Sequence, residues 1–244
     1  MTTLFSLNLN KIALLRNSRG TDYPNLEYFT KLAIESGVRS ITVHPRPDER
    51  HIRFDDLAVL ERVVRQNPGV ELNIEGYPND RFIEAVNAIK PDQVTLVPDG
   101  ENQLTSDHGW SIEGNEALLR DAVSRLQPSG ARVCLFWDPV PEGLDELVAL
   151  GVKGVELYTE PYVRAFEQDE ADILDDYVTS YEKAKALGLR VNGGHDLNLE
   201  NLGPFLQRCP VDEVSIGHGF MVESILQGFG PVVEAYLKIC SRQA

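Results

Sequence analysis

Cysteine and positive charge are both scarce in this chain of 244 residues. The three cysteines, Cys134, Cys209 and Cys240, cannot all pair and none stands at CxxC spacing, so we interpret them as reduced thiols of a cytoplasmic protein. Lys and Arg number 23 against 38 Asp and Glu, which gives a formal net charge of -15. Because an acidic chain repels a polyphosphate backbone, we expect no nucleic-acid partner.

Long apolar runs are absent as well. No segment approaches the ~20 apolar residues of a membrane-spanning helix, so we expect no membrane partner. The first residues have no basic stretch ahead of an apolar core, so we expect no signal peptide. The motifs GxxxxGK followed by Ser or Thr, HExxH and GxSxG are missing, and GxGxxG is never complete. No tight spacing of His and Cys supports a metal site, so we expect none.

The chain does contain eight short apolar runs rich in β-branched residues, whose starts lie 22 to 39 residues apart. They are Phe5–Asn10, Ser40–Pro45, Glu71–Gly76, Gln93–Asp99, Arg132–Asp138, Gly154–Thr159, Arg190–Gly194 and Glu213–Gly219. The runs are apolar rather than strictly alternating, which is typical of strands buried on both faces of a parallel sheet. Each gap is long enough for a crossover helix.

Helical periodicity fills several of these gaps. One apolar stripe begins at Leu26 and ends before Gly37, a second begins at Leu57, and a third begins at Phe82. Strands alternating with helices indicate an α/β fold, and eight such units in about 250 residues favour a closed (β/α)8 TIM barrel over an open doubly wound sheet. No linker or shift in composition divides the chain, so we predict one catalytic domain over residues 1–244.

Two segments depart from the repeat. Residues 99–115 form a long polar stretch after the fourth run, and connections of that length are often functional, so we expect a lid there. The last helical region is interrupted at residues 228–231, which leaves a short extra helix over about residues 220–227. Many barrels bind phosphate at a short helix after the eighth strand.

Reactive side chains gather where the predicted strands end, the face that carries the chemistry of such barrels. Four of the five histidines, His44, His51, His195 and His218, follow three different runs. A single histidine beside a strand is more often structural than catalytic, but four that converge on one mouth favour an active site.

Two glutamates lie inside runs suited to burial. Glu75 ends the third run, where a carboxylate is costly unless paired, and burial would raise its pKa toward the range of a general base. The structural alternative is a buried ion pair with a neighbouring strand. Glu156 in the sixth run invites the same interpretation with weaker support.

Glycines and arginines near the same ends suggest a phosphate site. The pairs before His195 and around His218 would let backbone N–H groups approach an anion near the N-terminus of the extra helix. Arg19 and Arg46 add positive charge where an acidic protein would otherwise repel a phosphorylated substrate.

These stretches together resemble the pyridoxine 5'-phosphate synthase family of bacterial vitamin B6 synthesis. The matching segments run in the family's order along the whole chain and cover residues 8–20, 41–52, 72–75, 96–98, 155–156, 189–195 and 216–218. The segment 41–52, which reads ITVHPRPDERHI, is especially distinctive. The resemblance implies a (β/α)8 barrel that assembles into a homo-octamer and needs no metal or organic cofactor.

The resemblance also implies the reaction, in which 3-amino-2-oxopropyl phosphate condenses with 1-deoxy-D-xylulose 5-phosphate to give pyridoxine 5'-phosphate, inorganic phosphate and water. By motif position, His44, Glu75 and His195 fall on the family's acid and base residues, and Glu156 falls on its transition-state stabiliser. Contacts to the amino-ketone phosphate fall on Asn8, Arg19, Gly217 and His218. Contacts to the deoxyxylulose phosphate fall on Arg46, His51 and Thr105.

This chain departs from the family's usual pattern at three further positions in the substrate pocket. Asn10 and Lys11 stand where the family usually has Asp-His, and Asp196 stands where it has Gly. Lys11 can still attract a phosphate or donate to a hydroxyl group. Two alternatives therefore stay open: a related barrel enzyme acting on another phosphorylated aldehyde or ketone, and a non-catalytic barrel that binds a phosphorylated metabolite.

Overall fold

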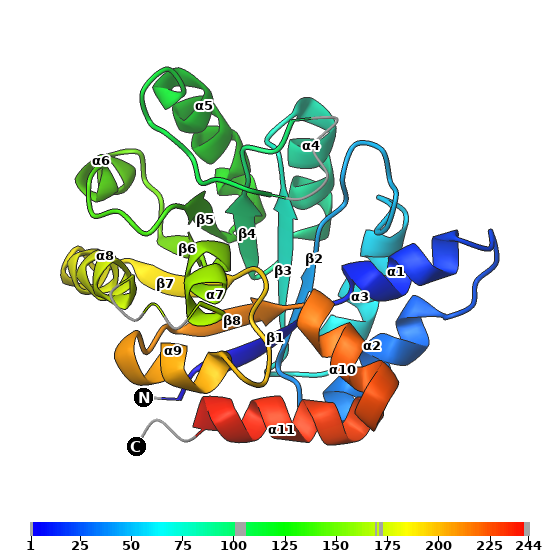
Figure 1. The fold of residues 1–244 in the computed structure, drawn as a ribbon. Coiled ribbons are helices and arrows are strands. Elements are labelled where there is room, and N and C mark those ends of the chain that lie inside the picture. The colour runs from blue at the N-terminus through cyan, green and yellow to red at the C-terminus, as the bar shows by residue number, and fades with distance from the viewer. Residues whose placement is uncertain (1, 101–105, 169, 171–172, 242–244) are drawn as a thin grey trace.

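The computed structural model describes residues 2–100, 106–168, 170 and 173–241. Its centre is a closed barrel in which eight parallel strands pair in chain order and β8 pairs with β1 (Figure 1). The strands are β1 (Leu4–Asn8), β2 (Ser40–Val43), β3 (Glu71–Gly76), β4 (Gln93–Leu96), β5 (Arg132–Trp137), β6 (Gly154–Tyr158), β7 (Arg190–Gly194) and β8 (Glu213–Ile216). Each coincides with one of the eight apolar runs, so the predicted barrel is confirmed and the open doubly wound sheet is wrong.

Helices surround the barrel and cover its outer face (Figure 1). They are α1 (Asn10–Asn17), α2 (Leu26–Glu35), α3 (Asp56–Arg65), α4 (Asp80–Ile89), α5 (Glu116–Leu126), η1 (Gln127–Ser129), α6 (Leu144–Ala149), α7 (Glu160–Phe166), α8 (Leu174–Ala186), α9 (Leu202–Arg208), α10 (His218–Gln227) and α11 (Phe229–Ser241). The extra helix predicted after the eighth strand is α10, which begins two residues earlier than expected. Two further doublings, α1 with α2 and α7 with α8, were not predicted.

Local signals explain where the predicted helices begin and end. The Asn25 side chain accepts the N–H of Tyr28 at 2.8 Å and caps α2, and Asn79 caps α4 by accepting the N–H of Phe82 at 2.9 Å. Gly37, with φ of +106°, stops the chain after α2 in a conformation that L side chains rarely adopt. The apolar stripe of α3 from Leu57 to Val64 is buried against the barrel.

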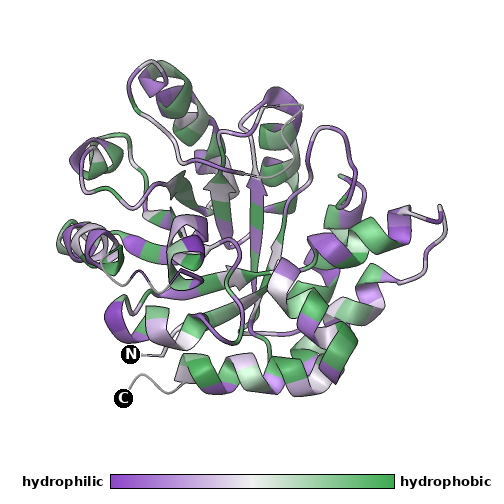
Figure 2. Cartoon of the chain, viewed as in Figure 1, coloured by the Kyte–Doolittle hydropathy of each residue, from purple (hydrophilic) through white to green (hydrophobic). Residues whose placement is uncertain are grey.

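The inner face of the barrel is polar, which corrects the expectation of uniformly apolar strands. Figure 2 shows the strands banded in hydrophilic and hydrophobic colours. The inner bands are joined by hydrogen bonds: the hydroxyls of Ser6 and Thr42 lie 2.7 Å apart, and Thr95 donates to Asn73 at 3.2 Å. The apolar residues that alternate with them, such as Ile41 and Val94, are buried beneath the helices. The barrel therefore buries apolar side chains outside its sheet and polar ones within it.

Within the described part of the chain, the model contains no helix long and apolar enough to span a membrane.

Candidate active site

The proton-transfer residues predicted from the sequence converge on the carboxyl ends of the strands. His44 follows β2 directly, Glu75 and Glu156 lie near the ends of β3 and β6, and His195 follows β7 directly. The two histidines and two glutamates therefore share one mouth of the barrel. His44 Nδ1 lies 4.0 Å from Glu75 Oε2, and both side chains are more than nine-tenths buried.

Two asparagines, at the end of β1 and at the start of α1, hold the residue that follows β2. Asn10 Oδ1 accepts the backbone N–H of His44 at 2.9 Å, and the N–H of Asn10 donates to Asn8 Oδ1 at 3.0 Å. Asn8 and Asn10 therefore link β1 to the residue that faces Glu75. His51 closes this side of the mouth, with its ring centroid 6.0 Å from that of His44 and its Nδ1 accepting the N–H of Ile52.

Glu75 is buried beside other acids rather than beside a cation. Burial raises its pKa well above the usual value, and the nearby carboxylates of Glu156 and Asp99 raise it further. A hydrogen bond with Ser215 offsets part of this shift. Among the described residues no Lys or Arg forms an ion pair with Glu75, so the alternative of a buried ion pair finds no support.

Glu156 is held in a similar environment. Burial is the main cause that raises its pKa to about 8, and the charge of Glu213 adds to the shift. Gly194 leaves room for this carboxyl group, because a Cβ at that position would lie 2.2 Å from Glu156 Oε1. Room for the Glu156 carboxyl group therefore explains the glycine before His195, without a role in binding phosphate.

The histidines of the mouth are shifted in the opposite direction. Burial, followed by the charge of Arg46, lowers the pKa of both His51 and His195 to about 4. Burial also lowers the pKa of His44 well below its usual value. The imidazoles are therefore neutral at neutral pH, and each can accept a proton from a substrate.

The start of α10 lies at the mouth directly after β8, next to β1 in the barrel. His218 begins α10, directly after Gly217, so the positive end of this ten-residue helix faces the strand ends. A Cβ on Gly217 would lie 3.0 Å from Asn8 Cβ, so a side chain there would displace Asn8. Asn8, Gly217 and His218 therefore lie together.

Arg46 and Lys11 bring positive charge to the mouth. Arg46 is buried, and its Nη1 lies 2.6 Å from Asp99 Oδ2, which also accepts the Ser106 hydroxyl at 2.8 Å. Lys11, in the first turn of α1, lies close enough for its charge to lower the pKa of His51 and of His195. Its effect is smaller than that of burial or of Arg46. Thr105 and the middle of the predicted lid lie outside the described residues.

Two of the predicted substrate contacts lie away from this cluster. Arg19 is exposed two residues beyond the far end of α1, which places it about 13 Å along the chain's path from Asn10. Asp196 is an exposed residue with φ of +58°, and its side chain lines a groove of about 610 Å³ between α7 and α10. The left-handed backbone at position 196 explains why the family pattern has a glycine there.

Sequence reasoning missed the residues that surround the catalytic side chains. Thr95 and Ser215 hydrogen-bond with the two glutamates, and Phe136, Tyr158 and Thr159 enclose His195. The available signal was the period-two polarity of β4 and β8, which was hidden by the burial of both strand faces.

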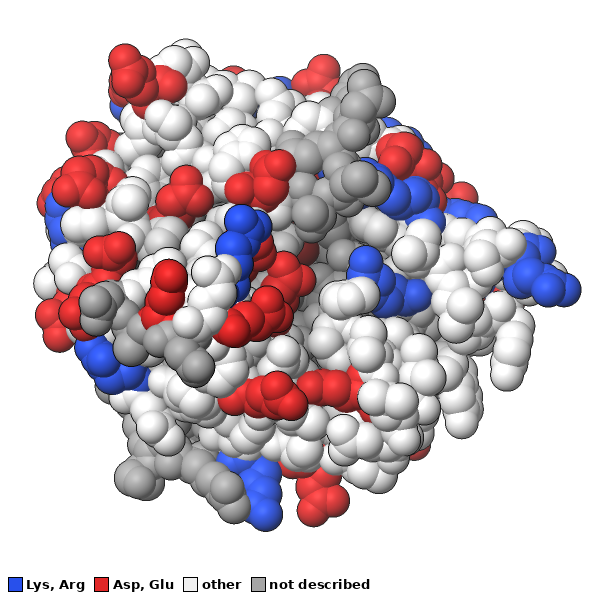
Figure 3. Space-filling view, viewed as in Figure 1, with Lys and Arg blue, Asp and Glu red and all other residues white. Residues whose placement is uncertain are grey.

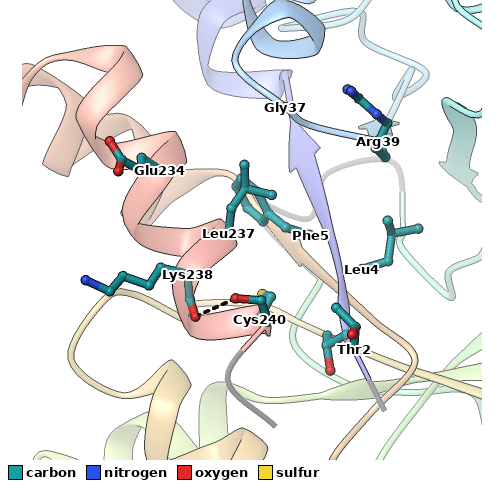
Figure 4. A pocket seen from close by; sticks show the side chains of 11 residues that line it. Thr2, Leu4, Phe5, Gly37, Arg39, Glu234, Leu237, Lys238 and Cys240 are labelled. Atoms are coloured by element: carbon teal, nitrogen blue, oxygen red, sulfur yellow. Dashed lines mark hydrogen bonds between the residues drawn. The ribbon is translucent and has the colours of Figure 1, made fainter. Parts of the chain in front are cut away.

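A second cavity, of about 600 Å³, lies at the amino ends of the strands between β1 and α11 (Figure 4). Its lining is mostly apolar, and the guanidinium of Arg39 there donates to the carbonyls of Ile34 and Val38. This cavity contains none of the predicted site residues. Among the described residues no group of three His, Cys, Asp or Glu side chains could hold a metal ion.

Solved structures with low sequence identity share the fold. A tryptophan synthase α-subunit mutant from Pyrococcus furiosus superposes with a TM-score of 0.62 at 12% identity, covering 99% of this chain and 97% of its own. A protein from Aquifex aeolicus superposes with a TM-score of 0.65 at 12% identity, covering 98% and 92%. At this identity the likeness supports the barrel alone.

Sequence relatives are far more similar. A pyridoxine 5'-phosphate synthase of Agrobacterium fabrum is 43% identical, covering 100% of this chain and 99% of its own. The enzyme of the same name from Brucella anthropi is 42% identical over 97% of this chain and 98% of its own. The model of the family described as pyridoxal phosphate biosynthesis protein PdxJ matches residues 5–242. The chain therefore belongs to the PdxJ family of pyridoxal phosphate biosynthesis enzymes.

Proposed function

We propose that the mouth of this barrel carries out the pyridoxine 5'-phosphate synthase reaction, condensing 3-amino-2-oxopropyl phosphate with 1-deoxy-D-xylulose 5-phosphate. The products are pyridoxine 5'-phosphate, inorganic phosphate and water. The observation that carries the proposal is the pair of buried glutamates, Glu75 and Glu156: Glu75 lies 4.0 Å from the neutral His44, and no Lys or Arg of the described residues forms an ion pair with either carboxyl group. Binding alone does not call for buried groups with shifted pKa values, whereas proton transfer does.

Imine formation, loss of water and phosphate, and ring closure each require protons to move. Glu75 removes a proton next to a carbonyl or imine when ionised, and His44, 4.0 Å away, is a neutral imidazole that can form a hydrogen bond with the protonated carboxyl group. His195 delivers or removes protons from the other side of the mouth. Glu156, with a pKa near 8, donates a hydrogen bond to charge that develops in the transition state.

The two phosphorylated reactants occupy two separate places in the mouth in this proposal. Asn8, Gly217 and His218 bind the amino-ketone phosphate at the start of α10. Arg46, His51 and Thr105 bind the deoxyxylulose phosphate, and Lys11 lies near its hydroxyl groups. A pocket re-formed by Asn10, Lys11 and Asp196 would instead favour the related enzyme, but Asp196 lines the groove between α7 and α10. Holding both reactants together supplies the proximity that a condensation needs.

Self-association into a homo-octamer is part of the proposal, and a surface of the chain supports it. Leu15 on α1, Tyr28 on α2, and Ile225 and Leu226 on α10 are each 57–78% exposed. Figure 2 shows hydrophobic colour on α1 and α10, and Figure 3 shows few charges over this part of the molecule. Arg19 lies at its edge, so a second copy docked here can place Arg19 at the neighbour's phosphate.

The three buried cysteines are unpaired, which supports a reducing compartment, and we place the enzyme in the cytoplasm.

The decisive experiment incubates the purified chain with both substrates and follows pyridoxine 5'-phosphate by absorbance and mass. Formation of the product with release of one phosphate per turnover is the expected result. Turnover of another phosphorylated aldehyde or ketone, without this product, would instead identify a related enzyme. Binding of both substrates without turnover of either would identify a binding protein.

A further inference from the structure

The backbone of His195 and its neighbour is left-handed at both positions. His195 has φ of +86° and Asp196 has φ of +58°, although neither is a glycine. A non-glycine residue held there is strained and persists only when its surroundings impose the conformation. Something next to the end of β7 must therefore stabilise this turn.

The hydroxyl of Thr159 stabilises this turn. Thr159 is fully buried between β6 and α7, and its Oγ1 lies 2.7 Å from the carbonyl oxygen of Gly194 and 2.5 Å from that of His195. In an extended strand successive carbonyls point in opposite directions. The left-handed φ of His195 turns its carbonyl to the same side as that of Gly194, so one hydroxyl reaches both.

The side chain of Thr159 does not cap the helix that it precedes. It is the N-cap residue of α7, where a threonine side chain normally accepts a backbone N–H of the first turn. Its side chain makes no such bond and instead donates toward β7. Its backbone N–H likewise donates to the carbonyl of Gly194, at 2.9 Å.

The imidazole of His195 is held between two aromatic rings as a result of this turn. Its ring centroid lies 4.9 Å from that of Phe136 and 5.5 Å from that of Tyr158, which it meets edge-on at 79°. A relaxed backbone at His195 would swing the ring out of this place. The backbone bond and the ring pocket therefore fix one orientation of the side chain.

We propose that Thr159 is a positioning residue for His195: its hydroxyl holds the left-handed turn that aims the imidazole into the mouth. The proposal rests on the proposed function, in which His195 transfers protons. Thr159 itself touches no substrate, and its effect passes entirely through the backbone of His195.

The test compares Thr159→Ser with Thr159→Ala, because both lack the methyl group and only the serine keeps the hydroxyl. We expect Thr159→Ser to keep kcat within about threefold of wild type and Thr159→Ala to lose about 10- to 100-fold, since a misplacement near 1 Å can cost that much. The KM of both substrates should stay within about threefold. Thr30→Val is the matched control, because it removes another fully buried hydroxyl, bonded to Leu26 O at 2.7 Å, far from the mouth.

Two readouts do not depend on the assigned reaction. A crystal structure of Thr159→Ala should show a changed φ at His195, and an NMR titration of the His195 ring should show its pKa raised from about 4 toward the usual 6.5 as the ring becomes hydrated. Absence of pyridoxine 5'-phosphate in the wild-type assay would refute the proposed function and leave these readouts standing. A Thr159→Ala chain whose His195 keeps its φ and its titration overturns the positioning role, and so does an equal loss of kcat in Thr159→Ser.

Discussion

Both ends of the barrel bury glutamates, but the partners of these glutamates differ. At the amino end, Glu213 lies 3.3 Å from Arg190 Nη2 and accepts hydrogen bonds from Ser40 and Gln93. At the carboxyl end, no Lys or Arg pairs with Glu75 or Glu156 among the described residues. The same side chain, buried at both ends, thus pairs with arginine at one end and forms no such pair among the described residues at the other, and our proposal assigns proton transfer to the second kind.

The pairing at the amino end continues around the barrel. Arg132 donates to Glu71 at 2.7 Å and to Gln93 at 2.9 Å, so charged and amide groups close this end in one network. Burial raises the pKa of Glu213, but the charges of Arg190 and Arg132 offset part of the shift. No Lys or Arg is among the groups that offset the raised pKa values of Glu75 and Glu156, which supports the proposal that these carboxyl groups exchange protons with substrate.

The largest expected effect is a loss of kcat when a proposed acid or base at the carboxyl end is replaced. We expect Glu75→Gln and His195→Ala each to lower kcat by about two to four orders of magnitude, the usual contribution of a positioned acid or base. Both variants should melt within a few degrees of wild type, because neither residue belongs to the paired network. Steady-state kinetics and thermal unfolding measure the two effects, and wild-type turnover in either variant would remove that residue from the mechanism.

A second prediction uses pH to separate the two ends. The folded chain holds a proton on Glu156 up to about pH 8, whereas an unfolded glutamate releases it near 4.5. The contribution of Glu156 to the free energy of unfolding should therefore fall as pH rises from about 4.5 to 8, on the order of 1.4 kcal/mol per unit, whereas His51 and His195 contribute a rise between about pH 4 and 6.5.

Glu156→Gln should flatten this pH dependence. Denaturant unfolding at pH 5 and pH 8 measures it, and a parallel slope in wild type and variant would mean that Glu156 is ionised in the folded chain.

Replacing a paired glutamate at the amino end should lower stability and leave turnover nearly unchanged. Glu213→Gln removes the carboxylate that faces Arg190, which is 24% exposed, so we expect a loss of roughly 1–3 kcal/mol in the free energy of unfolding rather than the full cost of a buried charge. Turnover measured below the new melting temperature should stay within about threefold of wild type. A variant that is stable but inactive would place Glu213 in the catalytic machinery.

Lys11 offers a smaller and more selective change at the mouth. Its charge lowers the pKa of His51, which we assign to the deoxyxylulose phosphate, and also that of His195. Lys11→Ala should raise the KM for that substrate by about tenfold and leave the KM for the amino-ketone phosphate nearly unchanged, and Lys11→His should restore much of the loss. Equal, small changes for both substrates would place Lys11 on the rim.

The smallest expected effect concerns the turn after His195. Asp196 has a left-handed backbone, so Asp196→Ala should lower the free energy of unfolding by about 1 kcal/mol, whereas Asp196→Gly should be neutral or slightly stabilising. Thermal unfolding of the two variants provides the comparison. A more stable alanine variant would show that the side chain, not the backbone, sets the preference for Asp.

The barrel could be predicted from sequence because the outward-facing residues of each strand are apolar and the eight runs recur at spacings long enough for a crossover helix. The helix α1 could not, because its exposed Leu14 and Leu15 break the pattern of a helix packed on one face. The catalytic candidates were predicted by position at strand ends. The placement of Arg19 was missed because an undetected helix carries it away from β1.

The role of Thr159 was beyond prediction for a different reason. Nothing in the sequence around it distinguishes it from an ordinary helix-capping threonine. Its hydroxyl acts on residues 35 and 36 positions later in the chain, through a backbone conformation that only the structure shows. Contacts of this kind depend on the neighbouring strand, not on the local segment.

The shifted protonation of the mouth changes how a bell-shaped rate profile of this enzyme must be assigned. In free amino acids a carboxyl group titrates below an imidazole. Here the order is exchanged, since burial brings His51 and His195 to about 4 and Glu156 to about 8. Activity lost on the acidic limb would then report histidines that gain a proton, and activity lost on the alkaline limb would report a glutamic acid that gives one up.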